Sequence, residues 1–544
     1  MVELFNYHYF SNMKTKKIFY ILLLILFFLS LIKTDYRLIN EINCCGDDFE
    51  YFIHAQTIAV DRDFDYRNQI LDSSNARFSH NDKIAPSGFV GAGLLSSPFY
   101  YIGYIFDKFF VGSSEFNFVI LFYSFSAIFY LFSTLILIIK SIEIIYPKVN
   151  YQFLTLFFFG TGISYYAFER YSMTHVYEAF TSSLIIFLTL KFSTINSKSN
   201  RNLFAFLIPF SILIGILCRW TNYYLYLLPI VVNYIYMKKF SNNNKLLENK
   251  FFYISIAISV ASFMQLSKLM YGVVTYNPQF IYSSNRLDEF IDINMDFVLN
   301  NIKNTILIFT TNEFGILWTA PCIAISILIC IVQLLKKKNI LINLISLLIF
   351  LQVFSVVLIW STTASSYGYR YLYSLIPYSI FYLYSSIENI QNTKIFKLLI
   401  GLSMIGLLSY VFFETTTLTQ LNVEPITNSF GKPNVPYSQP FYLTGVLRSI
   451  IILEAYLKIF ANGFLVALGF KILLKLFSYD EVIYYLELLN LPIQNQSFQD
   501  NLSAIISTDF VNIILFLSLN ISLVLFFIYL LSKKNQEKKK NVSW

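Results

Sequence analysis

The stretch KTKKIFYILLLILFFLSLI (residues 14–32) and the shorter GDDFEY (residues 46–51) that follows it decide the fold class of this chain. A basic front end ahead of a continuous apolar run is typical of a membrane-spanning helix whose N-terminus stays in the cytoplasm. Because no small-residue cleavage site follows, we expect a retained anchor rather than a cleaved signal peptide. The three acids of the second stretch then lie just outside the membrane, where ionisable side chains are functional candidates.

The composition extends this interpretation to the whole chain. Of its 544 residues, 56% are hydrophobic and only 13% are charged, which excludes an ordinary soluble domain and a disordered chain. The formal net charge of +8 is compatible with nucleic-acid binding, but the lysines cluster at the ends of apolar runs, as topology signals do. We therefore predict an all-α polytopic membrane protein with no nucleic-acid partner.

The apolar runs predict about 12 transmembrane helices. Every second junction between them is basic, which places these junctions and both chain termini in the cytoplasm. Residues 34–115 then form the first external loop, in which residues 88–106 are expected to lie along the membrane interface rather than to span it. The predicted spans are residues 18–32, 117–139, 151–168, 174–192, 203–218, 222–237, 251–269, 315–335, 340–360, 372–387, 396–413 and 510–531.

The distribution of predicted spans and charges divides the chain into two regions. Residues 1–447 form the predicted transmembrane catalytic domain. Residues 448–544 hold a segment with scattered charges (449–477), the last span and a basic tail. We expect residues 449–477 to be interfacial, because a further crossing would leave the basic tail outside, against the charge rule.

The first external loop carries the candidate catalytic acids. If residues 48–60 are helical, Glu50 and His54 share one face at a spacing of four, so a general base can lie against the bundle while its neighbours tune its pKa. The alternative is a solvated loop in which Asp47 or Asp48 merely caps a helix. For Asp47 the functional interpretation is favoured. The solvated-loop interpretation is favoured for Asp61, Asp63 and Asp65.

Further candidates follow along the external side. Lys83 precedes a proline turn, where it can either meet a lipid phosphate or serve as an interface anchor, and both alternatives stay open. His175 and Glu178 lie three residues apart at the start of a predicted helix. They can ligate a metal or position a substrate hydroxyl, although an acid there is also favourable for the helix dipole alone. Two residues do not make a metal site, so we favour substrate contact.

Two arginines close predicted spans on the outer side, against the positive-inside trend. Arg219 lies beside Trp220, and Arg370 lies between Tyr369 and Tyr371. A guanidinium group binds phosphate bidentately, which makes both arginines candidates for the phosphate of a lipid carrier. The alternative is an aromatic-stacked membrane anchor. For Arg370 the phosphate interpretation is favoured.

Other chemistries lack their motifs. The sequence has no P-loop lysine motif, no dinucleotide-binding glycine pattern, no nucleophile elbow and no zinc-protease motif. Nucleotide hydrolysis and proteolysis are therefore not expected.

In their order and topology, these features resemble the GT-C superfamily of membrane glycosyltransferases, particularly bacterial relatives of protein O-mannosyltransferases and of the lipid A aminoarabinose transferase. The resemblance extends over roughly the N-terminal two thirds of the chain. It depends on the acids of residues 47–51, the Lys-x-x-Pro turn at 83–86 and the Tyr-Arg-Tyr at 369–371. The chain departs from the family in lacking a doubled proline in that turn and a large C-terminal external domain. These departures bear on the identity of the acceptor more than on the type of reaction.

The resemblance implies an inverting glycosyltransferase that moves a sugar from a polyprenyl-phosphate donor to a lipid, glycan or protein acceptor on the extracytoplasmic face. Asp47, with its neighbour Asp48, would take the place of the catalytic base. The leaving phosphate would be stabilised by Arg370, Arg219 or Lys83. The other expected substrate-binding residues are Glu50, Tyr51, His175, Glu178 and Tyr369.

The cellular setting follows from the same interpretation. We expect an integral protein of a bacterial inner membrane, in contact with membrane lipids. No cofactor is required by the pattern, and a divalent cation is compatible with it. A polysaccharide polymerase or ligase would use the same transfer chemistry with a larger acceptor. The competing class is a transporter or flippase of lipid-linked glycan without catalysis, although such proteins often show inverted repeats and midplane charges that this sequence lacks.

Overall fold

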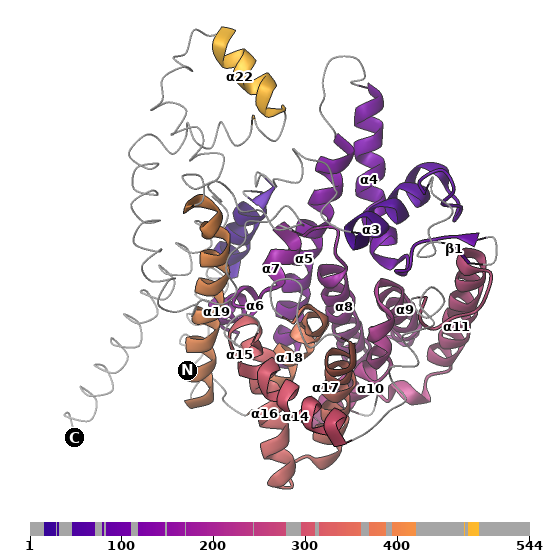
Figure 1. The fold of residues 1–544 in the computed structure, drawn as a ribbon. Coiled ribbons are helices and arrows are strands. Elements are labelled where there is room, and N and C mark those ends of the chain that lie inside the picture. Colours follow the sequence, from indigo (N-terminus) through magenta and orange to yellow (C-terminus); the bar gives the residue numbers. More distant parts are fainter. Residues whose placement is uncertain are drawn as a thin grey trace.

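The computed structural model is mostly helical (Figure 1). The residues that it describes are 16–28, 30–31, 46–70, 79–80, 83–109, 118–146, 149–168, 170–242, 244–278, 295–310, 315–360, 369–387, 394–419, 473 and 477–488. Its named elements are α3 (Gly46–Gln56), the π-helix η1 (Thr57–Asp61), β1 (Ser79–His80), β2 (Lys83–Ile84), α4 (Gly91–Phe109), α5 (Phe118–Ile145), α6 (Tyr151–Phe159), α7 (Ile163–Phe168), α8 (His175–Thr194), α9 (Lys198–Cys218), η2 (Trp220–Tyr226), α10 (Leu228–Phe240), η3 (Leu246–Glu248), α11 (Lys250–Tyr271), α14 (Met295–Thr310), α15 (Ile316–Thr319), α16 (Pro321–Leu335), α17 (Ile340–Trp360), η4 (Arg370–Leu375), α18 (Ile376–Ser386), α19 (Lys394–Thr419) and α22 (Tyr479–Leu488).

Four of the described helices are long and apolar enough to cross a membrane: α5, α8, α9 and α11. Helix α5 packs against α4, α7, α8 and α18, and α8 packs in turn against α9 and α10, so these two helices form the middle of the bundle. Helix α11 has an exposed apolar face that includes Tyr253, Ile254 and Ile258, as expected of a helix in contact with lipid. The all-α membrane architecture is therefore supported at this coarser level, while the full set of about 12 spans is not established.

Three predicted spans are interrupted at proline. Residues 222–237, 315–335 and 372–387 each comprise a short first turn and a separate helix, and the second helix begins at Leu228-Pro229, at Pro321 or at Ile376-Pro377. Proline fits the first turn of a helix because it lacks the N–H that this turn leaves unpaired, and it disfavours the α conformation in the residue before it. Hydropathy alone does not detect these breaks.

The predicted span 151–168 is also two helices, α6 and α7. The chain breaks at Gly160, where the carbonyl oxygen of Ser403 on α19 lies 2.5 Å from the place that a Cβ atom would occupy. The absence of a side chain lets two backbones approach at this point. The break separates α6 from α7, which ends at Phe168, a short connection before α8 begins at His175.

The predicted interfacial segment 88–106 forms helix α4, which is not among the helices that meet the length and hydropathy of a span. Its glycines let it pack closely between two neighbours. A Cβ atom at Gly91 would lie 2.3 Å from the backbone nitrogen of Cys218 on α9, and one at Gly93 would lie 2.3 Å from the Cβ of His54 on α3. Helix α4 thereby ties the first-loop helix α3 to the bundle.

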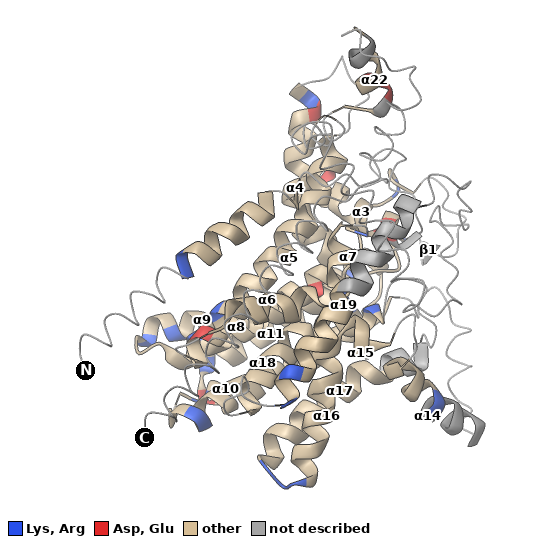
Figure 2. Cartoon of the chain, turned by 90° about the vertical axis from the view of Figure 1, so that its left-hand side faces the viewer, with Lys and Arg blue, Asp and Glu red and all other residues tan. Residues whose placement is uncertain are grey.

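Basic helix ends are connected with one another at one end of the bundle (Figure 2). Lys16, ahead of the first apolar run, forms an ion pair with Glu143 near the end of α5 at 2.7 Å. Lys239 at the end of α10 lies 3.5 Å from the ring centre of Tyr146. Lys238 is hydrogen-bonded to Asn339 in the turn between α16 and α17. The alternating basic junctions of the sequence thus meet in space.

Some predictions fall on residues that the structure does not describe. The last span, 510–531, lies outside the described residues, as does nearly all of the segment 449–477. Conversely, helix α14 lies where no span is predicted. Strands β1 and β2 form a two-residue antiparallel pair within the first loop, which the prediction of an all-helical chain does not include.

Candidate functional site

Helix α3 presents the acids of the first loop. It begins at Gly46 and Asp47, and the helix buries Asp48 and Glu50 against the bundle. The side chain of Asp47 lies outside the described residues, although its backbone belongs to the first turn of α3. Acids in the first turn of a helix are stabilised by the positive end of the helix dipole. The carboxylates of Asp48 and Glu50 are thus buried in the fold, in contrast to those of a solvated loop.

Asp48 forms a buried ion pair with Arg170, a residue in the connection between α7 and α8. Atom Nη2 of Arg170 lies 3.0 Å from Oδ2 of Asp48, and the two side chains are 6% and 1% exposed. The connection is held in a tight turn, because the backbone N–H of Arg170 donates to the carbonyl of Tyr165 and the N–H of Met173 donates to the carbonyl of Arg170. Two segments far apart in the sequence are joined at this point.

Glu50 and His54 share a face of α3, as their spacing predicts, and both bind the turn before α4. Oε2 of Glu50 accepts hydrogen bonds from the hydroxyl of Ser87 at 2.8 Å and from the N–H of Gly88 at 3.1 Å. Nε2 of His54 lies 3.0 Å from the carbonyl oxygen of Gly88, which also accepts from the hydroxyl of Tyr271 on α11. These contacts occupy one oxygen of Glu50 in the fold and tie α3, α4 and α11 together.

The tautomer of His54 follows from its partners. A carbonyl oxygen can only accept, so Nε2 carries the proton, and Nδ1 accepts from the hydroxyl of Tyr66 at 2.7 Å. Burial lowers the pKa of His54 to about 4, while the bond to the Gly88 carbonyl partly opposes this effect. The imidazole is consequently neutral at physiological pH and serves as a fixed structural link.

Two other residues of the loop lie near this turn. The ring of Tyr51 packs against Gly88, where an added Cβ atom would come within 2.9 Å of the ring. Lys83 is exposed on β2, a strand that packs beside α11. The described contacts place Tyr51 within the fold and Lys83 at its surface.

A second group of charged and aromatic side chains lies at the N-terminal end of α8. We define the Glu178 cluster as Thr174, His175, Glu178, Arg219 and Tyr371. Oε1 of Glu178 accepts from the hydroxyl of Thr174 at 2.5 Å, and it lies 3.4 Å from Nδ1 of His175 and 3.5 Å from Nη1 of Arg219. Nδ1 of His175 is also 3.4 Å from that guanidinium nitrogen. His175 can therefore donate to the carboxylate when Nδ1 is protonated and accept from the guanidinium when it is not.

The ring of Tyr371 brings two guanidinium groups into one place. The guanidinium carbon of Arg219 lies 4.2 Å from the ring centre, and that of Arg370 lies 5.3 Å from the same centre. Arg370 also contacts the sulfur of Met173 at 3.9 Å, and its backbone opens η4 directly after the buried Tyr369. Helix η4 packs against α8, which carries Glu178. The ring of His175 on α8 lies 6.5 Å from the same ring, so residues of α8, of the start of η2 and of η4 lie together at this point.

This convergence has a chemical consequence. Two guanidinium groups near one ring repel each other in surroundings that are largely buried, since Arg219 has a side chain only 13% exposed. An oxyanion that accepts hydrogen bonds from both would relieve that repulsion, and planar guanidinium groups match the geometry of phosphate. The site is thus suited to an anionic group next to an acid and an imidazole.

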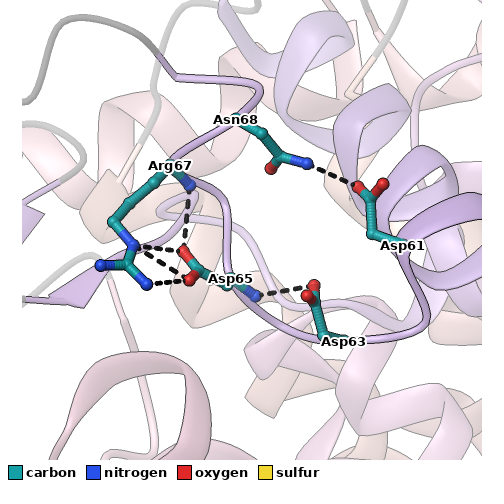
Figure 3. A network of polar contacts seen from close by, with 5 residues as sticks. All are labelled: Asp61, Asp63, Asp65, Arg67 and Asn68. Carbon is teal, nitrogen blue, oxygen red and sulfur yellow. Dashed lines mark hydrogen bonds and ion pairs between the residues drawn. The ribbon is translucent and has the colours of Figure 1, made fainter.

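Asp61, Asp63 and Asp65 are arranged differently (Figure 3). Asp61 ends η1 and the other two lie in the loop that follows it, and all three are partly or fully exposed. Arg67 binds both carboxylate oxygens of Asp65 and thereby lowers the pKa of that carboxyl. Asp63 accepts from the backbone N–H of Asp65 at 3.1 Å, and Asp61 accepts from the amide of Asn68 at 3.0 Å. These contacts agree with the solvated-loop interpretation.

Metal binding has no geometric support in the described part of the chain, where no group of three or more His, Cys, Asp or Glu side chains is placed to hold an ion. His175 and Glu178 form a pair without a third ligand of these types among the described residues. The contacts of the pair are instead with Thr174 and Arg219.

Sequence reasoning did not select Arg170 as a site residue. It carries the same signal as Arg219, because it is an arginine between predicted spans on the side that the positive-inside rule leaves poor in cations. Tyr371 was considered as an aromatic anchor, whereas the structure shows it as the ring that both arginines approach.

Comparisons with protein-family models, with curated proteins and with solved structures find no match to this chain.

Proposed function

We propose that this chain is an integral-membrane glycosyltransferase that transfers a sugar from a polyprenyl-phosphate donor to a lipid, glycan or protein acceptor at the extracytoplasmic face. The proposal is supported above all by the placement of Arg219 and Arg370 around Tyr371, beside Glu178 and His175. The sequence predicts phosphate or substrate contact for the two arginines, for His175 and for Glu178, and these four side chains lie together although they come from separate segments.

The orientation of the site agrees with this proposal. Helix α8 begins at His175 in the Glu178 cluster, and its other end carries Lys191 and packs near the basic junctions. The cluster and the basic helix ends are thus at opposite ends of one apolar helix. The positive-inside rule favours a cytoplasmic basic end, and we therefore infer that the cluster faces the outer side of the membrane.

In the proposed mechanism, Asp47 accepts the proton of the acceptor hydroxyl while that oxygen attacks the anomeric carbon of the donor. The bond from the anomeric carbon to the phosphate oxygen breaks in the same step, and the electron pair leaves with the lipid phosphate. Arg219 and Arg370 stabilise the charge that grows on this phosphate, as donors fixed in advance of the reaction do. One proton acceptor is sufficient, because no covalent sugar–enzyme intermediate forms.

The test uses the purified full-length protein in lipid nanodiscs with a panel of labelled polyprenyl-phosphate sugars. The wild type should release the headgroup of at least one donor when an acceptor extract is present. Asp47→Asn keeps the shape of the side chain but removes the base, so transfer should fall by about 100-fold or more. Asp65→Asn, in the exposed loop, is the matched control and should retain activity. Full activity in the Asp47 variant would remove the mechanism.

One observation favours a transporter or flippase of lipid-linked glycan as the second candidate. Helices are interrupted between α6 and α7 and between α15 and α16, and discontinuous helices often form binding sites in transporters. Proteoliposomes that contain a fluorescent lipid-linked glycan distinguish the two functions. Movement of intact glycan lipid across the bilayer, without loss of the headgroup, would support transport and contradict transfer.

A further inference from the structure

The connection between α7 and α8 contacts residues of α3, η4 and α8 in the candidate site. Its residue Arg170 binds Asp48 on α3 at 3.0 Å, and Met173 contacts Arg370 at 3.9 Å. The next residue, Thr174, donates to Glu178 at 2.5 Å. A stretch of five residues therefore joins the acidic helix of the first loop to both the carboxylate and one arginine of the site.

The ring of Tyr171 in this same connection adds an apolar contact on the α3 side. It packs edge-on against Tyr123 of α5, with ring centres 5.9 Å apart, and Tyr123 packs edge-on against Phe52 of α3 at 5.1 Å. Edge-to-face pairs of this kind stabilise a defined mutual orientation. The ion pair of Asp48 and Arg170 thus lies within a packed interface rather than on a mobile surface.

We propose that the Asp48–Arg170 ion pair is a positioning element, which holds the N-terminal end of α3, and with it Asp47, at a fixed place relative to Arg219 and Arg370. Asp48 then contributes to the reaction through Asp47 and does not itself accept the proton. The inference deepens the proposed function and rests on it for the role of Asp47. It departs from the expectation that both acids of the pair are catalytic.

The physical basis is the cost of disturbing this pair. Oδ2 of Asp48 is bound to a guanidinium that has almost no access to water, so removal of one partner takes a counter-ion away from the other buried charge. The simplest relaxation is a shift of the first turn of α3. Displacement of a reacting group by about 1 Å can lower a rate by about 100-fold, even when the mutated residue does not touch the substrate.

The first experiment measures kcat and donor KM for Asp48→Asn, Arg170→Gln, Arg170→Lys and the double variant Asp48→Asn with Arg170→Gln. A positioning pair predicts that both single variants lose kcat by similar factors, about 10-fold to 100-fold, with donor KM nearly unchanged. The double variant should be no worse than either single variant, because one interaction is lost in all three. Arg170→Lys should restore part of the activity. Arg67→Gln, which breaks the exposed pair with Asp65, is the matched control and should change neither constant.

The opposite pattern overturns the proposal. If Asp48 accepts the proton, Asp48→Asn will abolish transfer as completely as Asp47→Asn does, while Arg170→Gln will retain most of the activity. Losses that multiply in the double variant would likewise show that the two residues act separately.

The second experiment does not depend on sugar transfer. In a background with Cys44 and Cys45 changed to serine, Asp47→Cys is labelled with a membrane-impermeant maleimide, and the three remaining cysteines are buried. If the pair holds this end of α3, adding Arg170→Gln should change the labelling rate several-fold, whereas adding Arg67→Gln should not. An unchanged rate in protein that elutes as a single folded species would refute the positioning role. A changed rate together with no transfer from any donor would keep the positioning role and reject the proposed function.

Discussion

Acidification should destabilise this protein through one residue of the first loop, His54. Its imidazole is buried and bonded at both nitrogens, to the hydroxyl of Tyr66 and to the carbonyl of Gly88, and its pKa is lowered from 6.5 to about 4. The hydroxyl of Tyr271 reaches the same carbonyl from α11, and Glu50 on the same face of α3 binds the adjacent N–H. Protonation of Nδ1 would place two donors against each other at Tyr66, unless that hydroxyl rotates.

The sign and size of the effect follow from linkage. A histidine whose folded-state pKa is lowered binds its proton in the unfolded state first, so stability is unaffected above about pH 6.5 and falls as the pH decreases toward 4. Each pH unit in this window costs about 1.4 kcal/mol, because one pKa unit corresponds to that free energy. Over the whole window the loss is about 3 kcal/mol, a large part of the stability of a typical domain.

The assay compares the wild type with His54→Gln, which keeps an N–H donor in reach of the Gly88 carbonyl but does not titrate. Apparent Tm is measured by intrinsic fluorescence in detergent between pH 7.5 and 4.5. At pH 7.5 the variant should be less stable, by about 1 kcal/mol, since the hydroxyl of Tyr66 loses its acceptor. The difference should shrink and then reverse as the pH falls. Parallel curves for the two proteins would refute the burial of a neutral His54 and the argument built on it.

Two further predictions test the packing of α4 and the proposed phosphate site. Gly93→Ala places a Cβ atom 2.3 Å from the Cβ of His54 and should lower the free energy of unfolding by about 1–3 kcal/mol. Gly401→Ala, with nothing within 4 Å of the added Cβ atom, should be neutral or stabilising, and equal effects of the two variants in a thermal unfolding series would contradict the contact. Arg219→Lys removes the planar guanidinium and should reduce kcat/KM for the lipid-phosphate donor by about 10-fold to 100-fold. Arg201→Lys, at the opposite end of the bundle, is the control and should leave kcat/KM unchanged. An unchanged kcat/KM in the Arg219 variant would argue against phosphate contact.

The sequence predicts those features of the site that depend on spacing within one helix or on the charge at a helix end. The spacing of His175 and Glu178 on a helix predicts that they share a face, and the structure places Nδ1 and Oε1 3.4 Å apart. Their conflict with the positive-inside rule predicts an outer position for Arg219 and Arg370, and the structure brings both to one tyrosine ring. The same rule explains why the basic junctions meet at one end of the bundle.

Partners that are distant in the sequence could not be predicted in this way. Asp48 and Arg170 lie on different segments, and neither periodicity nor spacing specifies that they meet. The turn at Gly88 is another case, since the face shared by Glu50 and His54 was predicted but the peptide that they bind was not. The helix breaks at proline are a different case. Proline marks each break locally in the sequence, but a hydropathy average over about 20 residues does not detect it.

Helix α8 explains how one apolar span can place the site at the rim of a membrane. Several of its hydroxyl side chains are satisfied within the helix: Thr181, Thr189 and Ser193 each donate to a carbonyl three or four residues earlier. The helix can therefore be buried along its length without an internal charge, and its ionisable residues lie near its ends, from His175 to Lys191. Sixteen residues at 1.5 Å each separate these ends by about 24 Å, close to the thickness of about 30 Å of a hydrocarbon layer. If Lys191 lies at one face of a membrane, a helix of this length carries Glu178 and its neighbours toward the opposite face, where the proposed acceptor and lipid-bound donor would meet.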